Sequence, residues 1–154
     1  MKILFVCLGN ICRSPTAEGV MRHVIARAGA AHEVASAGTG NWHVGESPDP
    51  RTTAAAKKRG YDLSHQRAQQ LAMKHFAEFD LILAMDRSNL QGIERLARMC
   101  SGKVPPIELF RSYDPTAPDG AEVPDPYSGG AKGFEDVLDI CERACEGLLA
   151  ELKK

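Results

Sequence analysis

The segment from residue 1 to residue 15 constrains the fold most, because an apolar run leads directly into a polar loop and then into a helix start. The run is Lys2-Ile3-Leu4-Phe5-Val6, and its near-continuous apolar character is typical of a parallel strand buried on both faces. Ser14 and Pro15 match the N-cap and first position of a helix, and Gly29 marks its end. The pattern predicts a strand, a loop and a helix in immediate succession.

Apolar strands and helical patterns alternate along the rest of the chain, which predicts a mainly parallel sheet with helices on both faces. The expected strands are residues 2–6, 33–37, 79–85 and 104–110. The last of these is placed at an edge, because Pro105 and Pro106 cannot donate to a ladder. The fold class is therefore α/β, a three-layer sandwich around a four-stranded sheet. A length of 154 residues suits a single domain, residues 1–154.

The remaining helices are expected at three places along the chain. Asp49-Pro50 begins one that stops at Gly60, Asp86 caps another, and the last presents an apolar face from Phe134 to Leu152. Residues 111–133 are rich in Pro, Gly, Asp and Ser and are expected to form a long loop of the kind that is often functional.

Charge and cysteine content exclude several classes of protein. The formal net charge is −1, whereas nucleic-acid and membrane-surface binding both need a basic excess. No stretch is apolar for long enough to cross a bilayer, and the first strand is too short for a signal peptide. Five cysteines without framework spacing predict a reduced, cytoplasmic protein.

The loop from Cys7 to Ser14 has the composition of an anion site. Successive backbone N–H groups and a helix N-terminus can converge on a phosphate, contributed by Leu8, Gly9, Asn10, Ile11, Cys12, Arg13 and Ser14. Arg13 adds a bidentate fork, and the same positive field favours an ionised Cys7. Gly9 and Asn10 suit positive φ. The alternative is a buried cysteine at a strand end with Arg13 on the surface. No Walker A motif is present.

Several motifs together resemble the low-molecular-weight protein tyrosine phosphatases over nearly the whole chain. Val6 to Pro15 resembles the signature loop of that family, and Asp125-Pro126-Tyr127 resembles its general-acid loop. Trp42 and the stretch Pro48 to Arg51 resemble the eukaryotic-like branch, and Met85 to Leu90 matches a further family stretch. The resemblance implies hydrolysis of phosphotyrosine and small aryl phosphates through a cysteinyl-phosphate intermediate.

The resemblance also implies roles for individual residues. Cys7 is the nucleophile, Arg13 the phosphate clamp and Asp125 the general acid that later activates water. Asp114 and Asp119, in the same loop, have the pattern of ordinary turn aspartates. No metal or cofactor is expected, because Arg13 and the loop amides carry the phosphate charge.

The pocket walls are expected to be aromatic. Trp42 and Tyr127 can sandwich a ring, with apolar contact from Leu8 and Ile11. Many relatives carry two adjacent tyrosines after Asp-Pro, whereas this chain has Ser128 in second place. The implied partners are tyrosine-phosphorylated proteins, with a cognate tyrosine kinase among the candidates, and phosphate or other oxyanions at the site.

Further side chains are expected to support the loop or to pack. By resemblance, Ser36 and His65 brace it through Asn10 and Ser14, although the local pattern alone favours a surface loop position for His65. Cys12 either forms a reversible disulfide with Cys7 under oxidant or fills space behind the loop. The remaining cysteines are expected to pack in the core or against a helix: Cys100, Cys141 and Cys145.

Three other functions remain as alternatives. Relatives that act on phosphoarginine carry threonine where Ile11 stands. Thioredoxin-coupled arsenate reductases need two further relay cysteines, whereas Cys100 stands alone in the region 74–100. A phosphate-binding module without catalysis would need neither Cys7 nor Asp125.

Overall fold

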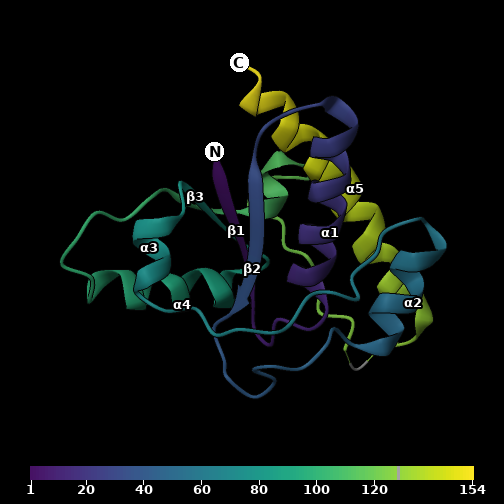
Figure 1. Ribbon diagram of the computed structural model, residues 1–154, viewed down its shortest axis with the longest axis horizontal. Helices are drawn as coiled ribbons and strands as arrows, with labels where there is room; N and C mark the ends of the chain where they lie inside the picture. Colours follow the sequence, from purple (N-terminus) through teal and green to yellow (C-terminus); the bar gives the residue numbers. More distant parts are fainter. Residues whose placement is uncertain (128) are drawn as a thin grey trace.

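The computed structural model describes residues 1–127 and 129–154 and contains one sheet of four parallel strands in the order β2-β1-β3-β4. The strands are β1 (Lys2–Cys7), β2 (Glu33–Gly38), β3 (Leu81–Ala84) and β4 (Ile107–Leu109). The helices are α1 (Arg13–Ala28), α2 (Pro50–Lys58), α3 (Lys74–Glu78), α4 (Arg87–Arg98), η1 (Phe110–Tyr113, a 3-10 turn) and α5 (Ala131–Leu152). The predicted α/β class and parallel sheet are confirmed (Figure 1).

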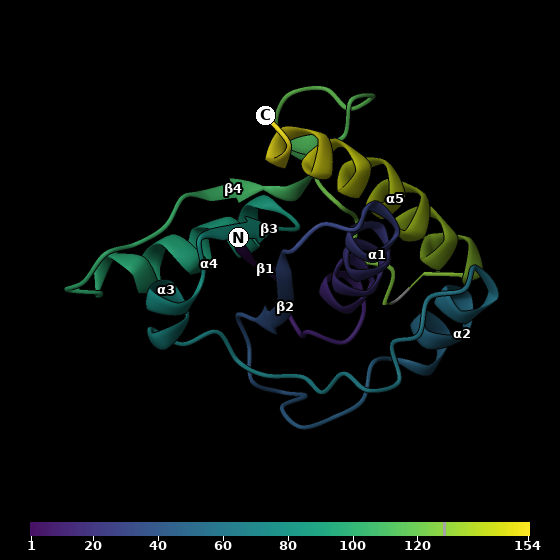
Figure 2. The same cartoon turned by 45° about the horizontal axis from the view of Figure 1, so that its top comes forward.

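The sheet is covered on both faces, and the alternation of side chains along β1 divides the core in two. Ile3 and Phe5 pack with α1 and α5 on one face, whereas Leu4 and Val6 pack with α3 and α4 on the other. All four side chains are fully buried, which explains why the sequence of this strand is continuously apolar. Figure 2 shows the two helical layers on opposite sides of the strands.

The start of α1 differs from the sequence prediction. The helix begins at Arg13 with Cys12 at the N-cap, so Ser14 is already inside the first turn and does not cap it. The reason is that the Ser14 hydroxyl lies against the sulfur of Cys7 instead of a helix N–H. The end of the helix is as expected, because Gly29 adopts a left-handed φ of 65°.

Other element boundaries are mostly confirmed. Asp49 and Asp86 cap α2 and α4 by accepting from the backbone N–H groups of Arg51 and Asn89. The edge strand β4 is shorter than predicted, because Pro105 and Pro106 precede its ladder. The short helix α3 was not expected, and η1 spans the end of the predicted strand 104–110 and the start of the predicted long loop. None of the helices in residues 1–127 and 129–154 is long and apolar enough to span a membrane.

Asp114 is more than a turn aspartate. Its side chain is fully buried beside η1, where it forms ion pairs with Arg111 and Arg143 and accepts from Thr116. Burial opposes ionisation, but the hydrogen bonds from Thr116, Arg143 and Arg111 outweigh it and lower the pKa of Asp114 to about 2. The pair with Arg143 attaches the end of η1 to α5.

This lowered pKa predicts a pH-dependent contribution to stability. Since the folded pKa lies below the unfolded one, the contribution of about 2 kcal/mol is present above pH ~4 and is lost as the pH falls toward 2. Asp114→Asn should lower the free energy of unfolding in urea at pH 7, and its deficit against wild type should shrink over that range. Asp119→Asn, at an exposed position, is the control. A deficit that stays constant with pH would contradict the assignment.

Candidate active site

The loop between β1 and α1 closes around the sulfur of Cys7, the last residue of the strand. Cys7 is 3% exposed, and the backbone N–H of Asn10 donates to its Sγ over 3.2 Å. Asn10 has a φ of 58°, a left-handed conformation that asparagine tolerates better than most residues. The hydroxyl of Ser14 lies 3.0 Å from the same sulfur. The sulfur is therefore held between a backbone donor and a hydroxyl.

The glycine in this loop has a different purpose from the one expected. Positive φ occurs at Asn10 and not at Gly9. A Cβ at Gly9 would lie 3.2 Å from Cδ2 of His43, a separation that crowds the imidazole. Gly9 is therefore needed for the close approach of the His43 ring.

The carboxamide of Asn10 fixes the direction of the hydrogen bonds around the sulfur. Its Oδ1 accepts from the backbone N–H of Gln69 over 2.9 Å, so its Nδ2 must be the donor to Ser14 at 2.8 Å and to Ser36 at 2.9 Å. Because the Ser14 oxygen already accepts that bond, its own proton is free to point at the Cys7 sulfur. This direction suits an ionised sulfur, which can only accept.

The network continues away from the sulfur to a buried carboxylate that the sequence analysis missed. Ser36 donates its proton to Oε1 of Glu18 over 2.8 Å, and Oε2 of Glu18 accepts from Arg22 over 2.6 Å. Glu18 is one turn beyond the loop on α1 and only 7% exposed. Its position within the helix resembles that of an ordinary surface charge, so no local pattern identifies it as part of the site.

The expected role of His65 is wrong. His65 is exposed, and no hydrogen bond among the described residues joins it to Asn10 or Ser14. The buried neighbour is Gln66, whose Nε2 donates to the carbonyl of Pro15. The segment supports the loop through that amide and through the backbone of Gln69. The other reading of His65, as a surface residue, is confirmed.

Arg13 is held beside the sulfur by groups from two other parts of the chain. Its Nη1 donates to Oδ2 of Asp86 over 2.6 Å and to the carbonyl of Val123 over 3.0 Å. Asp86 thus has two roles, since its other oxygen caps α4; the sequence analysis found only the cap. Arg13 is 3% exposed, and Nη2 lies 3.7 Å from Oδ2 of Asp125. The surface position considered for Arg13 is therefore excluded.

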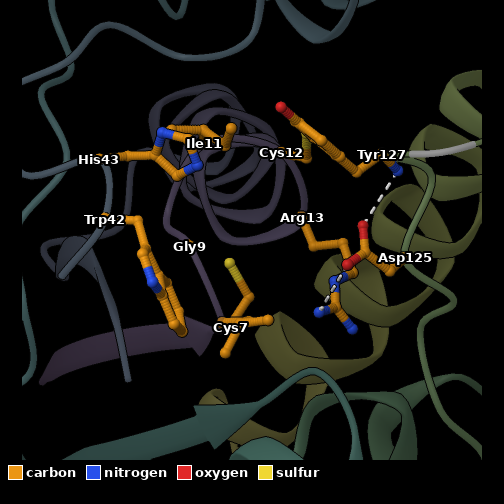
Figure 3. Close-up of a pocket in the computed structure, with 10 residues that line it drawn as sticks. Cys7, Gly9, Ile11, Cys12, Arg13, Trp42, His43, Asp125 and Tyr127 are labelled. Carbon is orange, nitrogen blue, oxygen red and sulfur yellow. Dashed lines mark hydrogen bonds and ion pairs between the residues drawn. The ribbon is translucent and has the colours of Figure 1, made fainter. Parts of the chain in front are cut away.

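Asp125 stands at the mouth of the same pocket (Figure 3). Its Oδ1 accepts from the backbone N–H of Tyr127 over 3.0 Å, and its side chain is 48% exposed. The carboxyl group is therefore oriented by its own loop while one oxygen remains open to the pocket. Asp114 and Asp119 do not line this pocket.

Aromatic side chains form the outer walls, as predicted. Trp42 is 66% exposed, and its indole lies against Gly40, where any side chain would collide with the ring. Tyr127 borders the pocket on the other side, and the His43 ring lies between them, 6.4 Å from the Tyr127 ring. His43 was missed as a wall residue; its Nδ1 pairs with Glu46 over 3.1 Å. The described residues that line the pocket are Cys7, Leu8, Gly9, Ile11, Cys12, Arg13, Trp42, His43, Asp125 and Tyr127.

Comparison with known proteins agrees with this geometry. Residues 2–154 match the family described as low molecular weight phosphotyrosine protein phosphatase. The chain belongs to this family. A low molecular weight protein-tyrosine-phosphatase of Streptomyces coelicolor is 46% identical, over 99% of this chain and 94% of that protein.

Two solved structures are similar along the whole chain. The protein tyrosine phosphatase of Entamoeba histolytica has a TM-score of 0.88 and 41% identity, covering 99% of this chain and 97% of that one. The Drosophila arginine phosphatase DARP has a TM-score of 0.94 and 33% identity, covering 100% and 99% of the two chains. The fold is thus shared by phosphatases named for different phosphorylated residues.

The five cysteines of this phosphatase are all free thiols. Cys12 lies in the loop itself and is buried, which raises its pKa to about 11, so it is a neutral thiol at pH 7. Cys141 and Cys145 are fully buried on α5, and Cys100 packs against the α4 face of the sheet, which confirms their packing roles. In the part of the chain that the structure describes, no group of three His, Cys, Asp or Glu could hold a metal ion.

The support network predicts different effects for Asn10, which belongs to it, and His65, which does not. Asn10→Gly keeps the backbone conformation available but removes the carboxamide, so inorganic phosphate should bind about tenfold more weakly, equivalent to about 1.4 kcal/mol. His65→Ala should bind phosphate as wild type does. Isothermal titration calorimetry measures both affinities. A loss with His65→Ala equal to that with Asn10→Gly would restore the bracing role that the structure denies to His65.

Proposed function

We propose that this phosphatase hydrolyses phosphotyrosine in proteins through a cysteinyl-phosphate intermediate. The observation that carries the proposal is the convergence of Cys7, Arg13 and Asp125 on one pocket. These side chains come from the end of β1, the start of α1 and a loop more than a hundred residues away. A module that only bound phosphate would need neither the sulfur nor the carboxyl group.

In the first step, the phosphoryl group enters with its oxygens against the loop amides from Leu8 to Ser14 and the Arg13 guanidinium. The Cys7 thiolate forms a bond to phosphorus as the bond to the phenolic oxygen breaks. Asp125, protonated at this stage, gives its proton to the departing phenolate. Asp86 and the Val123 carbonyl hold Nη1 of Arg13, which leaves the face toward the sulfur for phosphate.

In the second step, the carboxylate of Asp125 takes a proton from water as the water oxygen attacks phosphorus. The sulfur leaves as a thiolate, and phosphate is released. The Ser14 proton, directed at the sulfur by the bond from Asn10, stabilises the departing thiolate. Phosphate charge is met at both steps by Arg13 and backbone N–H groups.

The walls of the pocket favour an aromatic substrate. Trp42 and Tyr127 expose large ring surfaces beside the loop, and Ile11 adds apolar contact below them.

The place of Ser128, where many relatives carry a second tyrosine, lies outside the described residues. We propose tyrosine-phosphorylated proteins as substrates, a cognate kinase among them, and the reducing cytoplasm as the compartment, consistent with five free thiols.

The mechanism predicts distinct losses for its nucleophile and its acid. Cys7→Ser should abolish turnover of a phosphotyrosine peptide while still binding phosphate. Asp125→Ala should lower kcat/KM for phenyl phosphate about 100-fold or more, but far less for 2,4-dinitrophenyl phosphate, whose leaving group needs no proton. Asp119→Ala, in the same loop, is the control. Equal losses of Asp125→Ala on both esters would refute its role as the acid.

Phosphoarginine is a second candidate substrate, because the structure of an arginine phosphatase matches this chain along its whole length. Ile11 is 8% exposed at the pocket surface. An aliphatic side chain there contacts an aryl ring well but offers no polar atom to a guanidinium.

Ile11→Thr therefore tests the choice between the two substrates. The variant should shift the ratio of turnover rates from a phosphotyrosine peptide toward a phosphoarginine peptide, measured as phosphate release. Ile11→Val, which keeps the apolar contact, should leave the ratio near that of wild type. Preferred hydrolysis of phosphoarginine by the unmodified protein would overturn the tyrosine assignment.

The positions of the cysteines argue against arsenate reduction but are compatible with a disulfide between Cys7 and Cys12. Arsenate reduction needs thiols that relay a disulfide outward, but Cys141 and Cys145 are fully buried in the core, and Cys100 is on the face of the sheet opposite to Cys7.

Cys12 lies in the same loop as Cys7. We propose that after peroxide converts Cys7 to a sulfenic acid, the Cys12 thiol displaces water and closes a reversible disulfide.

A further inference from the structure

Arg51, in the first turn of α2, is in contact with the loop that carries Asp125. Its guanidinium carbon lies 5.4 Å from the ring centre of Tyr127 and 4.8 Å from that of Phe134. Its Nη2 donates to the Tyr127 carbonyl over 2.9 Å. The same guanidinium donates two hydrogen bonds to the Asp49 carboxylate, from Nε to Oδ1 over 3.2 Å and from Nη2 to Oδ2 over 3.0 Å. The guanidinium of Arg51 therefore donates to a carboxylate and to a backbone carbonyl while it lies near two aromatic rings.

Asp49 links this arginine to the loop from Cys7 to Ser14, the phosphate loop. The backbone N–H of Asp49 donates to the Ile11 carbonyl over 2.9 Å, and its carboxylate caps α2 by accepting from the Arg51 N–H over 2.7 Å. The side-chain hydrogen bonds from Arg51 hold the pKa of Asp49 below its usual value, so the pair stays ionised at neutral pH. Asp49 is 8% exposed, so its carboxylate is held in place and anchors the longer side chain of Arg51.

On the side of Arg51 away from Asp49, Tyr127 connects Arg51 to the general acid Asp125. The Tyr127 carbonyl accepts from Arg51, and the Tyr127 N–H donates to Oδ1 of Asp125. A continuous series of contacts therefore runs from Ile11 through Asp49, Arg51 and Tyr127 to Asp125. Among the described residues from 124 to 130, the bond from Arg51 is the side-chain hydrogen bond that arrives from another helix or strand.

We propose that Arg51 is a positioning residue that holds the general-acid loop at a fixed distance from the phosphate loop. The inference rests on the proposed function, because it concerns the geometry of proton transfer by Asp125. The need for such a link follows from the exposure of Asp125, whose own contacts are one N–H of its loop and an arginine nitrogen 3.7 Å away. A shift of about 1 Å at a reacting group can cost up to about 100-fold in rate. Arg51 also places the Tyr127 ring that forms a pocket wall.

A second arginine on the same helix provides a matched control. Arg59, at the C-terminal end of α2, forms ion pairs with Glu135, Asp139 and Glu142 of α5 at 2.8–2.9 Å. It joins α2 to α5, as Arg51 does through Phe134, but it touches neither the acid loop nor the pocket. Substitution of Arg59 therefore reports the cost of loosening α2 without disturbing Asp125.

The experiment compares kcat/KM for phenyl phosphate and 2,4-dinitrophenyl phosphate in wild type, Arg51→Met, Arg51→Lys and Arg59→Met. We expect Arg51→Met to lose about tenfold or more on phenyl phosphate and less than about threefold on the dinitrophenyl ester. Arg51→Lys, which keeps the cation but loses the fork, should show an intermediate loss on phenyl phosphate. Arg59→Met should lower the melting temperature while affecting the two esters equally. Inorganic phosphate should inhibit all four proteins with similar constants.

Each other outcome has a separate meaning. Equal losses on both esters in both Arg51 variants, with intact circular dichroism spectra, would overturn the positioning role. The same leaving-group selectivity in Arg59→Met would also overturn it, because loosening α2 would then be sufficient. If Arg51→Met fails to fold, Arg51→Lys decides alone. Absence of phosphate release by wild type, or its persistence in Cys7→Ser, would instead refute the proposed function itself.

Discussion

The carboxamide of Asn10 is the constraint on which the rest of the site depends. One backbone N–H, that of Gln69, occupies its oxygen, and this single bond decides which way every proton in the network points. The two hydroxyls that accept from the Asn10 amide must direct their own protons outward, one to the sulfur and one to a buried glutamate. A sulfur surrounded only by donors is poised as an acceptor, which is the state that a nucleophile and a leaving group both require.

The fold places this network at the carboxyl ends of the parallel strands. β1 lies between β2 and β3 in the sheet. The connection from β1 therefore runs to one side to reach β2, and the chain then crosses to the other side of β1 to form β3. Loops at the carboxyl ends of such strands diverge and leave a crevice, the usual binding place in open α/β sheets. The phosphate loop fills the floor of that crevice, and Asp86, following β3, reaches Arg13 across it. The arrangement needs no insertion or second domain.

Much of this could be predicted because the signals were local. The apolar strand, the loop after it and Gly29 are defined by neighbouring residues, and each is found where expected. Asp125 was identified only by the family resemblance, since an aspartate in a Pro-rich loop has no distinguishing local pattern. Proximity to Arg13, more than a hundred residues away in sequence, is what the structure adds.

The errors and omissions have a common physical origin in long-range contact. Ser14 is of a residue type that commonly caps helices, but its hydroxyl lies against the Cys7 sulfur, and the helix begins two residues earlier than predicted. His65 and Gln66 are neighbours, and which of them turns inward depends on the path of the loop past Pro15. Arg51 resembles a solvated helix charge until Tyr127 is packed against it.

The most direct measurement is the mass of the acid-quenched enzyme during turnover of 2,4-dinitrophenyl phosphate, followed by peptide mapping. We expect one added phosphoryl group, located on Cys7, in a larger fraction of Ser14→Ala than of wild type, because the thiolate then departs without its hydroxyl donor. A phosphoryl group on any other residue, or no greater accumulation in Ser14→Ala, would contradict it.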